Sequence, residues 1–138
     1  MSQQGGAYFE QGSGDLVVPA GATLDISAGL LVDAASGNVA VAADELAIPV
    51  TAAHVSKTTG ADAEALTLAD GRAGQVLTLA LVVDGGGTGT LTPATKTGFA
   101  TIVFADAGDI ATLKYIDDTV GWVLLGTAGV AAPPVITI

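Results

Sequence analysis

Short apolar runs, separated every few residues by glycine, aspartate or proline, make up most of this chain. Runs rich in valine, isoleucine, leucine and threonine are typical of β-strands, and the residues between them are typical of tight turns. Glutamate, lysine, arginine and glutamine, which favour helices, are scarce. The pattern therefore predicts an all-β protein.

Length and charge narrow the classes of protein that fit. The chain has 138 residues, enough for one domain with a small appended arm and for a core that needs no metal or disulfide. It carries 14 acidic and 4 basic residues, a formal net charge of −10. Such an excess of carboxylates disfavours contact with nucleic-acid phosphates or an anionic membrane surface. We therefore expect no nucleic-acid partner and no membrane partner.

Several kinds of site are excluded by residue type. The chain has no cysteine and one histidine, so a thiolate nucleophile and a cysteine-ligated zinc are absent, and only a carboxylate-rich metal site stays open. The longest apolar run, residues 76–83, is too short for a membrane-spanning helix, and residues 1–6 lack the features of a signal peptide. Half of the residues are apolar, which favours a large subunit interface.

The first 50 residues divide into two predicted segments. Residues 1–14 are polar and glycine-rich and are expected to form a flexible arm that carries Tyr8 and Phe9; the alternative is a disordered tail with incidental aromatics. In residues 15–50, glycines at positions 21, 29 and 37 each precede a short apolar stretch. We expect one turn and one short strand per unit, at residues 23–26, 31–34 and 39–42.

Strands this short bury little surface by themselves. They form either an ordinary β-meander or an intertwined stalk between subunits. The side chains expected at a trimer interface in such a stalk are Leu24, Ile26, Leu31, Val32, Val39 and Val41.

The rest of the chain is predicted to hold the main domain. Residues 43–60 are expected to be a connector, which overlaps the start of a domain that spans residues 51–128. Its turn spacing suits a compact antiparallel β-sandwich or barrel. The predicted strands are residues 65–68, 75–83, 90–92, 100–104, 110–116 and 121–125. Residues 129–138 are expected to be an extended tail whose last four residues either add an edge strand to a neighbour or fray.

Candidate chemical motifs are weak. The glycine-rich loop at residues 84–89 lacks the lysine and the helix of a phosphate-binding loop, which favours a long hairpin turn. His54 and Ser56 share a strand face, so a serine nucleophile assisted by the histidine is formally possible. Nothing marks the third partner that such a site needs, which favours a structural or surface histidine. The acidic loops at residues 106–109 and 117–118 suit either calcium or plain turn capping. Trp122 lies in an apolar run, which favours a core or interface position over a sugar platform.

We therefore expect no catalytic residues, no metal and no cofactor, and a protein that is not an enzyme. The alternative enzyme class, a small polysaccharide or cell-wall hydrolase, would require a perturbed carboxylate pair in a cleft.

From residue 60 to residue 126 the sequence resembles a domain of tailed-bacteriophage virion proteins. The resemblance lies in the runs GQVLTL (74–79), DGGGTGTLTP (84–93) and KTGFATIVF (96–104), and in the segment from residue 106 to Trp122. The glycine-punctuated N-terminal units also resemble the N-terminal segments of phage head-fibre and capsid-decoration proteins. These are turn and core positions, which identify a fold more than a function.

The resemblance implies a head decoration (cement) protein or a short head fibre. Such proteins sit as homotrimers on the capsid exterior, bind the major capsid protein and brace the shell, and the family supplies no catalytic residues. The acidic charge is consistent with a place outside the shell, away from packaged DNA. Tyr8 and Phe9 would then dock the arm in a capsid groove. The alternative implied by the resemblance is a tail-fibre or receptor-binding tip module that recognises a host surface.

Overall fold

A computed structural model describes residues 8–9, 16–17, 20–21 and 38–138. The chain divides into two units, Met1–Val32 and Asp33–Ile138. In the first unit, β1 (Tyr8–Phe9) and β2 (Leu16–Val17) pair antiparallel, with Tyr8 opposite Val17. The predicted stalk residues Leu24, Ile26, Leu31 and Val32 lie outside the described residues.

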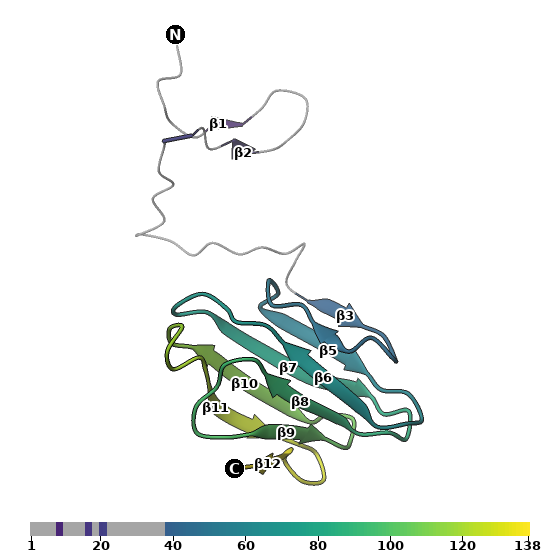
Figure 1. Ribbon diagram of the computed structural model, residues 1–138. Coiled ribbons are helices and arrows are strands. Elements are labelled where there is room, and N and C mark those ends of the chain that lie inside the picture. The colour runs from purple at the N-terminus through teal and green to yellow at the C-terminus, as the bar shows by residue number, and fades with distance from the viewer. Residues whose placement is uncertain (1–7, 10–15, 18–19, 22–37) are drawn as a thin grey trace. The chain divides into compact units, whose positions relative to one another are not determined.

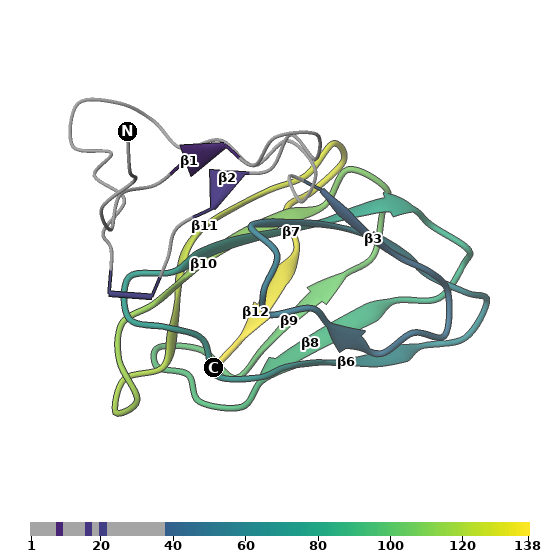
Figure 2. The same cartoon turned by 90° about the horizontal axis from the view of Figure 1, so that it is seen from above.

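The second unit is built from two five-stranded sheets that face each other (Figures 1 and 2). Every regular element of the described residues is a strand, which confirms the all-β prediction. The first sheet has the order β11-β10-β7-β5-β3, and the second has the order β12-β9-β8-β6-β4. The strands are β3 (Val39–Val41), β4 (Ala47–Ile48), β5 (His54–Thr58), β6 (Glu64–Leu68), β7 (Val76–Val83), β8 (Gly89–Pro93), β9 (Thr101–Phe104), β10 (Ile110–Tyr115), β11 (Trp122–Ala128) and β12 (Val135–Thr137).

The sheets are mixed, so the prediction of an antiparallel sandwich or barrel is wrong in two respects. From β3 to β8 the chain passes from one sheet to the other at every turn, so strands that are neighbours in a sheet are two apart in sequence. The pairs β3–β5, β5–β7, β4–β6 and β6–β8 are consequently parallel. The sheets also do not close into a barrel, because each ends in strands with a free edge.

Within the sandwich, antiparallel pairing begins at β7, which pairs with β10. β8 and β9 form a hairpin in the second sheet, and β10 and β11 form one in the first. β12 pairs with β9 of its own chain, where an edge strand added to a neighbour or a frayed end was expected. The register of β10 and β11 shifts by one residue, since Thr112 lies opposite Gly126 and Leu113 opposite Leu124. Leu125 is therefore the extra residue of a β-bulge.

The core lies between the two sheets. Alternate side chains of each strand point inward, as in β6 (Glu64, Leu66, Leu68) and β10 (Ala111, Leu113, Tyr115). The largest buried side chains are Trp122, Tyr115 and Phe104, with leucines from β6, β7, β8 and β10 around them. Most of these strands are predicted by another signal, the short apolar runs between turn residues.

The sandwich begins earlier in the chain than the expected boundary at residue 51. β3 and β4 are the outer strands of the two sheets, and residues 43–60, expected to be a connector, contain β4 and β5. Within the part of the chain that the structure describes, no helix has the length and apolar character needed to cross a membrane.

Candidate functional site

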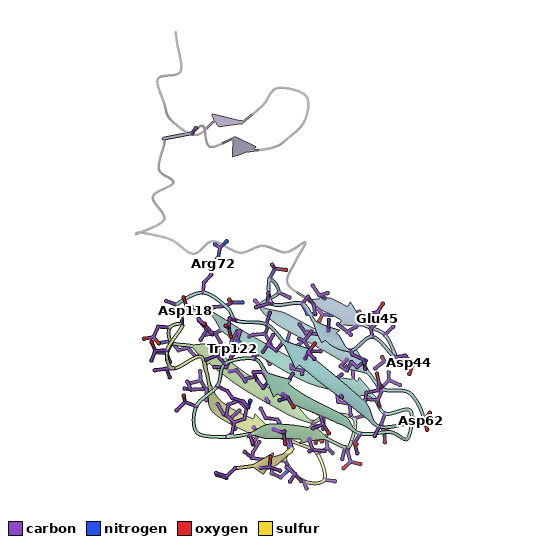
Figure 3. All side chains as sticks on the ribbon, in the orientation of Figure 1. Asp44, Glu45, Asp62, Arg72, Asp118 and Trp122 are labelled. Atoms are coloured by element: carbon purple, nitrogen blue, oxygen red, sulfur yellow. The ribbon has the colours of Figure 1, made fainter. Side chains whose placement is uncertain are left out.

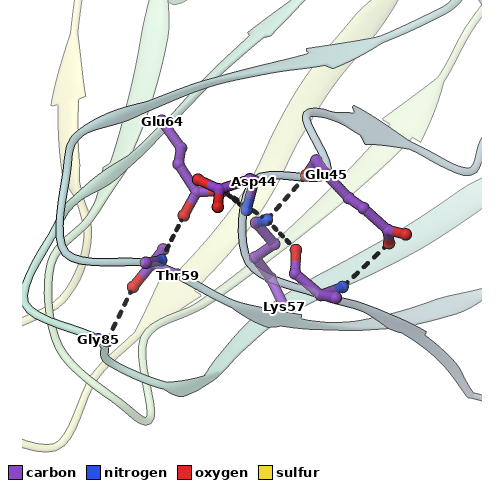
Figure 4. A network of polar contacts seen from close by, with 8 residues as sticks. Asp44, Glu45, Lys57, Thr59, Glu64 and Gly85 are labelled. Carbon is purple, nitrogen blue, oxygen red and sulfur yellow. Dashed lines mark hydrogen bonds and ion pairs between the residues drawn. The ribbon is translucent and has the colours of Figure 1, made fainter.

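At the β3–β4 end of the sandwich, a buried ion pair joins the two sheets (Figure 4). Lys57 of β5 and Glu64 of β6 lie with Nζ and Oε1 2.8 Å apart, and their side chains are 2% and 3% exposed. Lys57 Nζ also donates to the carbonyl oxygens of Ala42 and Glu45. The pair therefore holds the connection between β3 and β4 against both sheets.

Glu64 is fully engaged as an acceptor. Its Oε1 accepts from the Asp44 N–H and its Oε2 from the Gly60 N–H, at 2.8 and 2.7 Å. Burial alone would raise the pKa of Glu64, but the hydrogen bond from Lys57, the two backbone N–H groups and the charge of Lys57 together lower the pKa below its usual 4.5. A buried carboxylate held ionised by three hydrogen bonds in this way stabilises the fold and is shielded from solvent.

The glycine-rich loop has a structural part in the same region. It joins β7 of one sheet to β8 of the other, so it is a crossover between sheets and the predicted hairpin turn is wrong. Its N–H groups are already used: Gly85 donates to Thr59 Oγ1, Gly86 to Asp84 Oδ1 and Gly87 to the Gly60 carbonyl. A phosphate would have to displace all three hydrogen bonds.

His54 and Ser56 lie on the outward face of β5, as their spacing predicts. Ser56 Oγ donates to Asn38 Oδ1 at 2.7 Å. This hydrogen bond fixes the edge strand β3 to its neighbour and directs the serine hydroxyl toward the edge of the sheet. The pair has the position of surface residues of a sheet.

The two acidic loops act as turn caps. Asp117 Oδ1 accepts from the N–H groups of Thr119 and Val120, and Asp109 Oδ2 accepts from those of Ala105 and Asp106. Side-chain capping of this kind is why aspartate favours turns. Among the described residues, no three acidic or histidine side chains come together as metal ligands.

Trp122 lies in the core, where its residue type and apolar neighbours predicted it. Its indole N–H donates to the Ala69 carbonyl at 2.9 Å, and its ring meets Tyr115 edge-on at a centroid distance of 5.3 Å. Both side chains are fully buried. Trp122 is therefore a packing residue between β11 and the loop that follows β6.

A pocket of about 540 Å³ opens between the loop after β4 and the loop after β6. Its polar members are Thr51, Asp70, Arg72 and Gln75. Arg72, the only arginine of the chain, is labelled in Figure 3. Asp70 already accepts from the N–H and hydroxyl of Thr95, and Gln75 binds the Val50 carbonyl and the Arg72 N–H. The guanidinium of Arg72 is the charged group that the pocket offers to a ligand.

The opposite end of the sandwich, formed by β11 and β12, has a different character, and we call it the uncharged side (residues 121–138). It contains no charged side chain, although the whole chain has a net charge of −10. Among the described residues, five large apolar side chains are more than half exposed, and four of them lie here. These four are Leu125 (57%), Val130 (86%), Val135 (60%) and Ile138 (99%).

A shallow groove of about 240 Å³ separates the two outer strands on this side. Phe99, Val123, Leu124 and Ile136 supply its apolar lining. Beside it, the bulge in β11 leaves Leu125 without a partner on β10, and a bulge is a means of redirecting one side chain. The uncharged side thus combines an apolar groove with projecting apolar side chains, which is the character of a protein-binding surface.

The remaining predicted site residues that the structure describes belong to two different units. Tyr8 and Phe9 form β1 in the first unit. Val39 and Val41 belong to β3 of the sandwich, where Val41 is 4% exposed and Val39 packs against the same core. Val41 is thus part of the core of its own chain.

Sequence reasoning missed the Lys57–Glu64 pair and the uncharged side. A signal for each was present: Lys57 and Glu64 occupy inward positions of alternating strands, and residues 121–138 lack charge. No protein-family model, no curated protein and no solved structure matches this chain. The site is therefore interpreted from its own geometry and charge.

Proposed function

We propose that this chain is a structural virion protein that binds the exterior of a bacteriophage capsid as a homo-oligomer and stabilises the shell. The observation that carries the proposal is the uncharged side, an apolar binding surface on an otherwise acidic sandwich. Such a surface suits a permanent protein contact, because interface cores are depleted of charged residues. The resemblance of residues 60–126 to phage virion domains supplies the setting.

The state of the polar side chains supports a binding role over a chemical one. Glu64 is buried and bonded to Lys57 and two backbone N–H groups, and Asp109 and Asp117 cap turns. Ser56 is bonded to Asn38. These groups stabilise loops and sheets, and the surfaces that remain for a partner are apolar or acidic.

Stabilisation of the shell would follow from mass action. A ligand that binds only the assembled shell lowers its free energy by RT ln(1 + [L]/Kd), which is about 2.7 kcal/mol at a free concentration of one hundred times Kd. An oligomer that contacts several capsid subunits at once gains further affinity by avidity. The acidic exterior would keep the protein away from packaged DNA.

The test is binding to shells of the major capsid protein of the same phage. The purified chain should co-sediment with mature empty shells. It should also raise the temperature at which a dye gains access to the interior of the shells or the shells dissociate. A variant without residues 1–12 tests the arm: we expect it to fold and to lose capsid binding if Tyr8 and Phe9 anchor it. Shells that neither bind the full chain nor gain stability would contradict the proposal.

A second candidate, a receptor-binding tip of a tail fibre, is favoured by the pocket that contains Arg72. The pocket has the size of a small-ligand site and offers one guanidinium, which suits a carboxylate or phosphate group on a host glycan. An array of anionic and neutral glycans separates the candidates. Binding of an anionic glycan that is lost in Arg72→Gln would favour the tip module.

A further inference from the structure

We propose that the uncharged side is the surface through which copies of this chain bind one another. The inference deepens the proposed function and rests on it in one respect, since it takes the chain to act by binding. The partner it names is a second copy of the chain. The contact would run along β11 and β12, with Leu125 near its centre.

Charge restricts where two copies can meet. Each copy has a net charge of −10, so approach through most faces brings carboxylates together. Figure 3 labels Asp44, Glu45 and Asp62 at the β3–β4 end. Residues 121–138 have no charged side chain along either outer strand. A second copy therefore meets no like-charge repulsion from the side chains of these two strands.

The two ends of the sandwich differ in how their strand edges are protected. At the other end, β3 and β4 have three and two residues, and Asp44 and Glu45 lie in the short connection between them. Short strands and charges are devices by which proteins prevent pairing at sheet edges. β11 has seven residues and no charged side chain, so the outer strand of the first sheet has neither device; β12 is as short as β3 but also has no charge.

The uncharged side is also self-complementary in shape. It carries a groove lined by Phe99, Val123, Leu124 and Ile136, and beside the groove it carries projecting side chains. The bulge turns Leu125 outward, and Val135 is similarly exposed. One copy thus supplies both the apolar groove and the apolar side chains that a second copy needs, which is the requirement for a symmetric contact.

The test compares the same substitution at the two ends of the sandwich. Light scattering would measure the mass of the full chain, of Leu125→Asp and of Leu46→Asp over a range of concentrations. Leu46 lies next to β4 at the opposite end, and its side chain is 43% exposed, compared with 57% for Leu125. We expect the wild type and Leu46→Asp to be oligomers, and the dissociation constant of Leu125→Asp to rise about 30-fold or more.

Crosslinking gives an independent readout that does not depend on a destabilising change. The chain has no cysteine, so single-cysteine variants can be crosslinked with a short bis-maleimide. Ala128 on β11 and Ala47 on β4 are both exposed. We expect Ala128→Cys to crosslink between copies and Ala47→Cys to stay monomeric on a denaturing gel.

Several results would overturn the inference. They are a monomeric wild type, a Leu125→Asp variant that keeps the wild-type mass, and crosslinking through Ala47→Cys in place of Ala128→Cys. Capsid binding is scored separately. A monomer that still binds shells would overturn this inference and keep the capsid-binding part of the proposed function, whereas an oligomer built on β11 and β12 that ignores shells would do the reverse.

Discussion

Lys57 and Glu64 come from facing sheets and meet in the interior, with Nζ and Oε1 2.8 Å apart. The alternation of side chains along β5 places Lys57 on the inward face, and the alternation along β6 places Glu64 there as well. Removing two charges from water is costly, and this pair offsets the cost because backbone groups satisfy both partners. The ion pair thus fixes how the β3–β4 connection closes one end of the sandwich.

Replacing Lys57 by methionine should destabilise the protein by about 3–5 kcal/mol, since Glu64 would stay buried without its partner. The free energy of unfolding in urea measures the effect. Lys114→Met is the matched control, because Lys114 lies on the outward face of β10 and its loss should change stability by about 0.5 kcal/mol or less. Equal effects of the two variants would show that the buried pair has no special part in stability.

Glu64 should make stability depend on acid pH. Its pKa is lowered in the folded state, so its contribution is present above the unfolded value of 4.5 and is lost as pH falls below it through the folded pKa. Glu64→Gln cannot ionise and should be less stable than the wild type at neutral pH. The difference in unfolding free energy between the two proteins should shrink as pH falls below 4.5. A difference that stays constant down to the acid transition would contradict this account.

Most strands could be predicted from the sequence, but their pairing could not. The turn residues between residues 42 and 88 show where the chain reverses direction. They do not show whether the next strand returns beside its predecessor or crosses to the facing sheet, because both connections use the same glycine and aspartate chemistry and the same inward alternation. β4 escaped prediction for another reason: two residues, Ala47 and Ile48, are too few to display alternation.

In the candidate site, too, local features could be predicted from the sequence and features that depend on topology could not. Trp122 was predicted to be buried because its neighbours in sequence are apolar, and that is a local property. The Lys57–Glu64 pair depends on two strands of different sheets, which no local pattern places together. The uncharged side is legible in the sequence as a lack of charge, but only the topology shows that β11 and β12 form the same end of the sandwich.

Gly87 should tolerate no side chain. A Cβ at this position would lie 1.9 Å from the Asp62 carbonyl oxygen, so Gly87→Ala must push the two crossover loops apart. We expect a loss of about 1–3 kcal/mol, measured by urea unfolding. Gly60→Ala is the control in the same pair of loops, since its Cβ would make only ordinary contacts at 3.5 and 3.7 Å. If both variants were as stable as the wild type, the loops would not be packed as described.

Tyr115 should resist ionisation. Burial, the hydrogen bond to Asp118 at 2.8 Å and the charges of Asp118, Asp70 and Asp117 raise its pKa from 10 to about 12. The neutral form is favoured in the folded state, so this contribution to stability is complete below pH 10 and is lost as pH rises through about 12. In a titration followed by tyrosinate absorbance, one of the two tyrosines should ionise late, together with unfolding.

The assignment rests on Tyr115→Phe, which keeps the ring against Trp122 and removes the hydroxyl. The late step should disappear in this variant, and the remaining absorbance change should belong to Tyr8 alone. Asp118→Asn supplies the second control: it removes the nearest charge while keeping a side-chain oxygen that can accept the hydroxyl, so the late step should move toward lower pH. A late step that survives in Tyr115→Phe would contradict the assignment and place the perturbed tyrosine elsewhere in the chain.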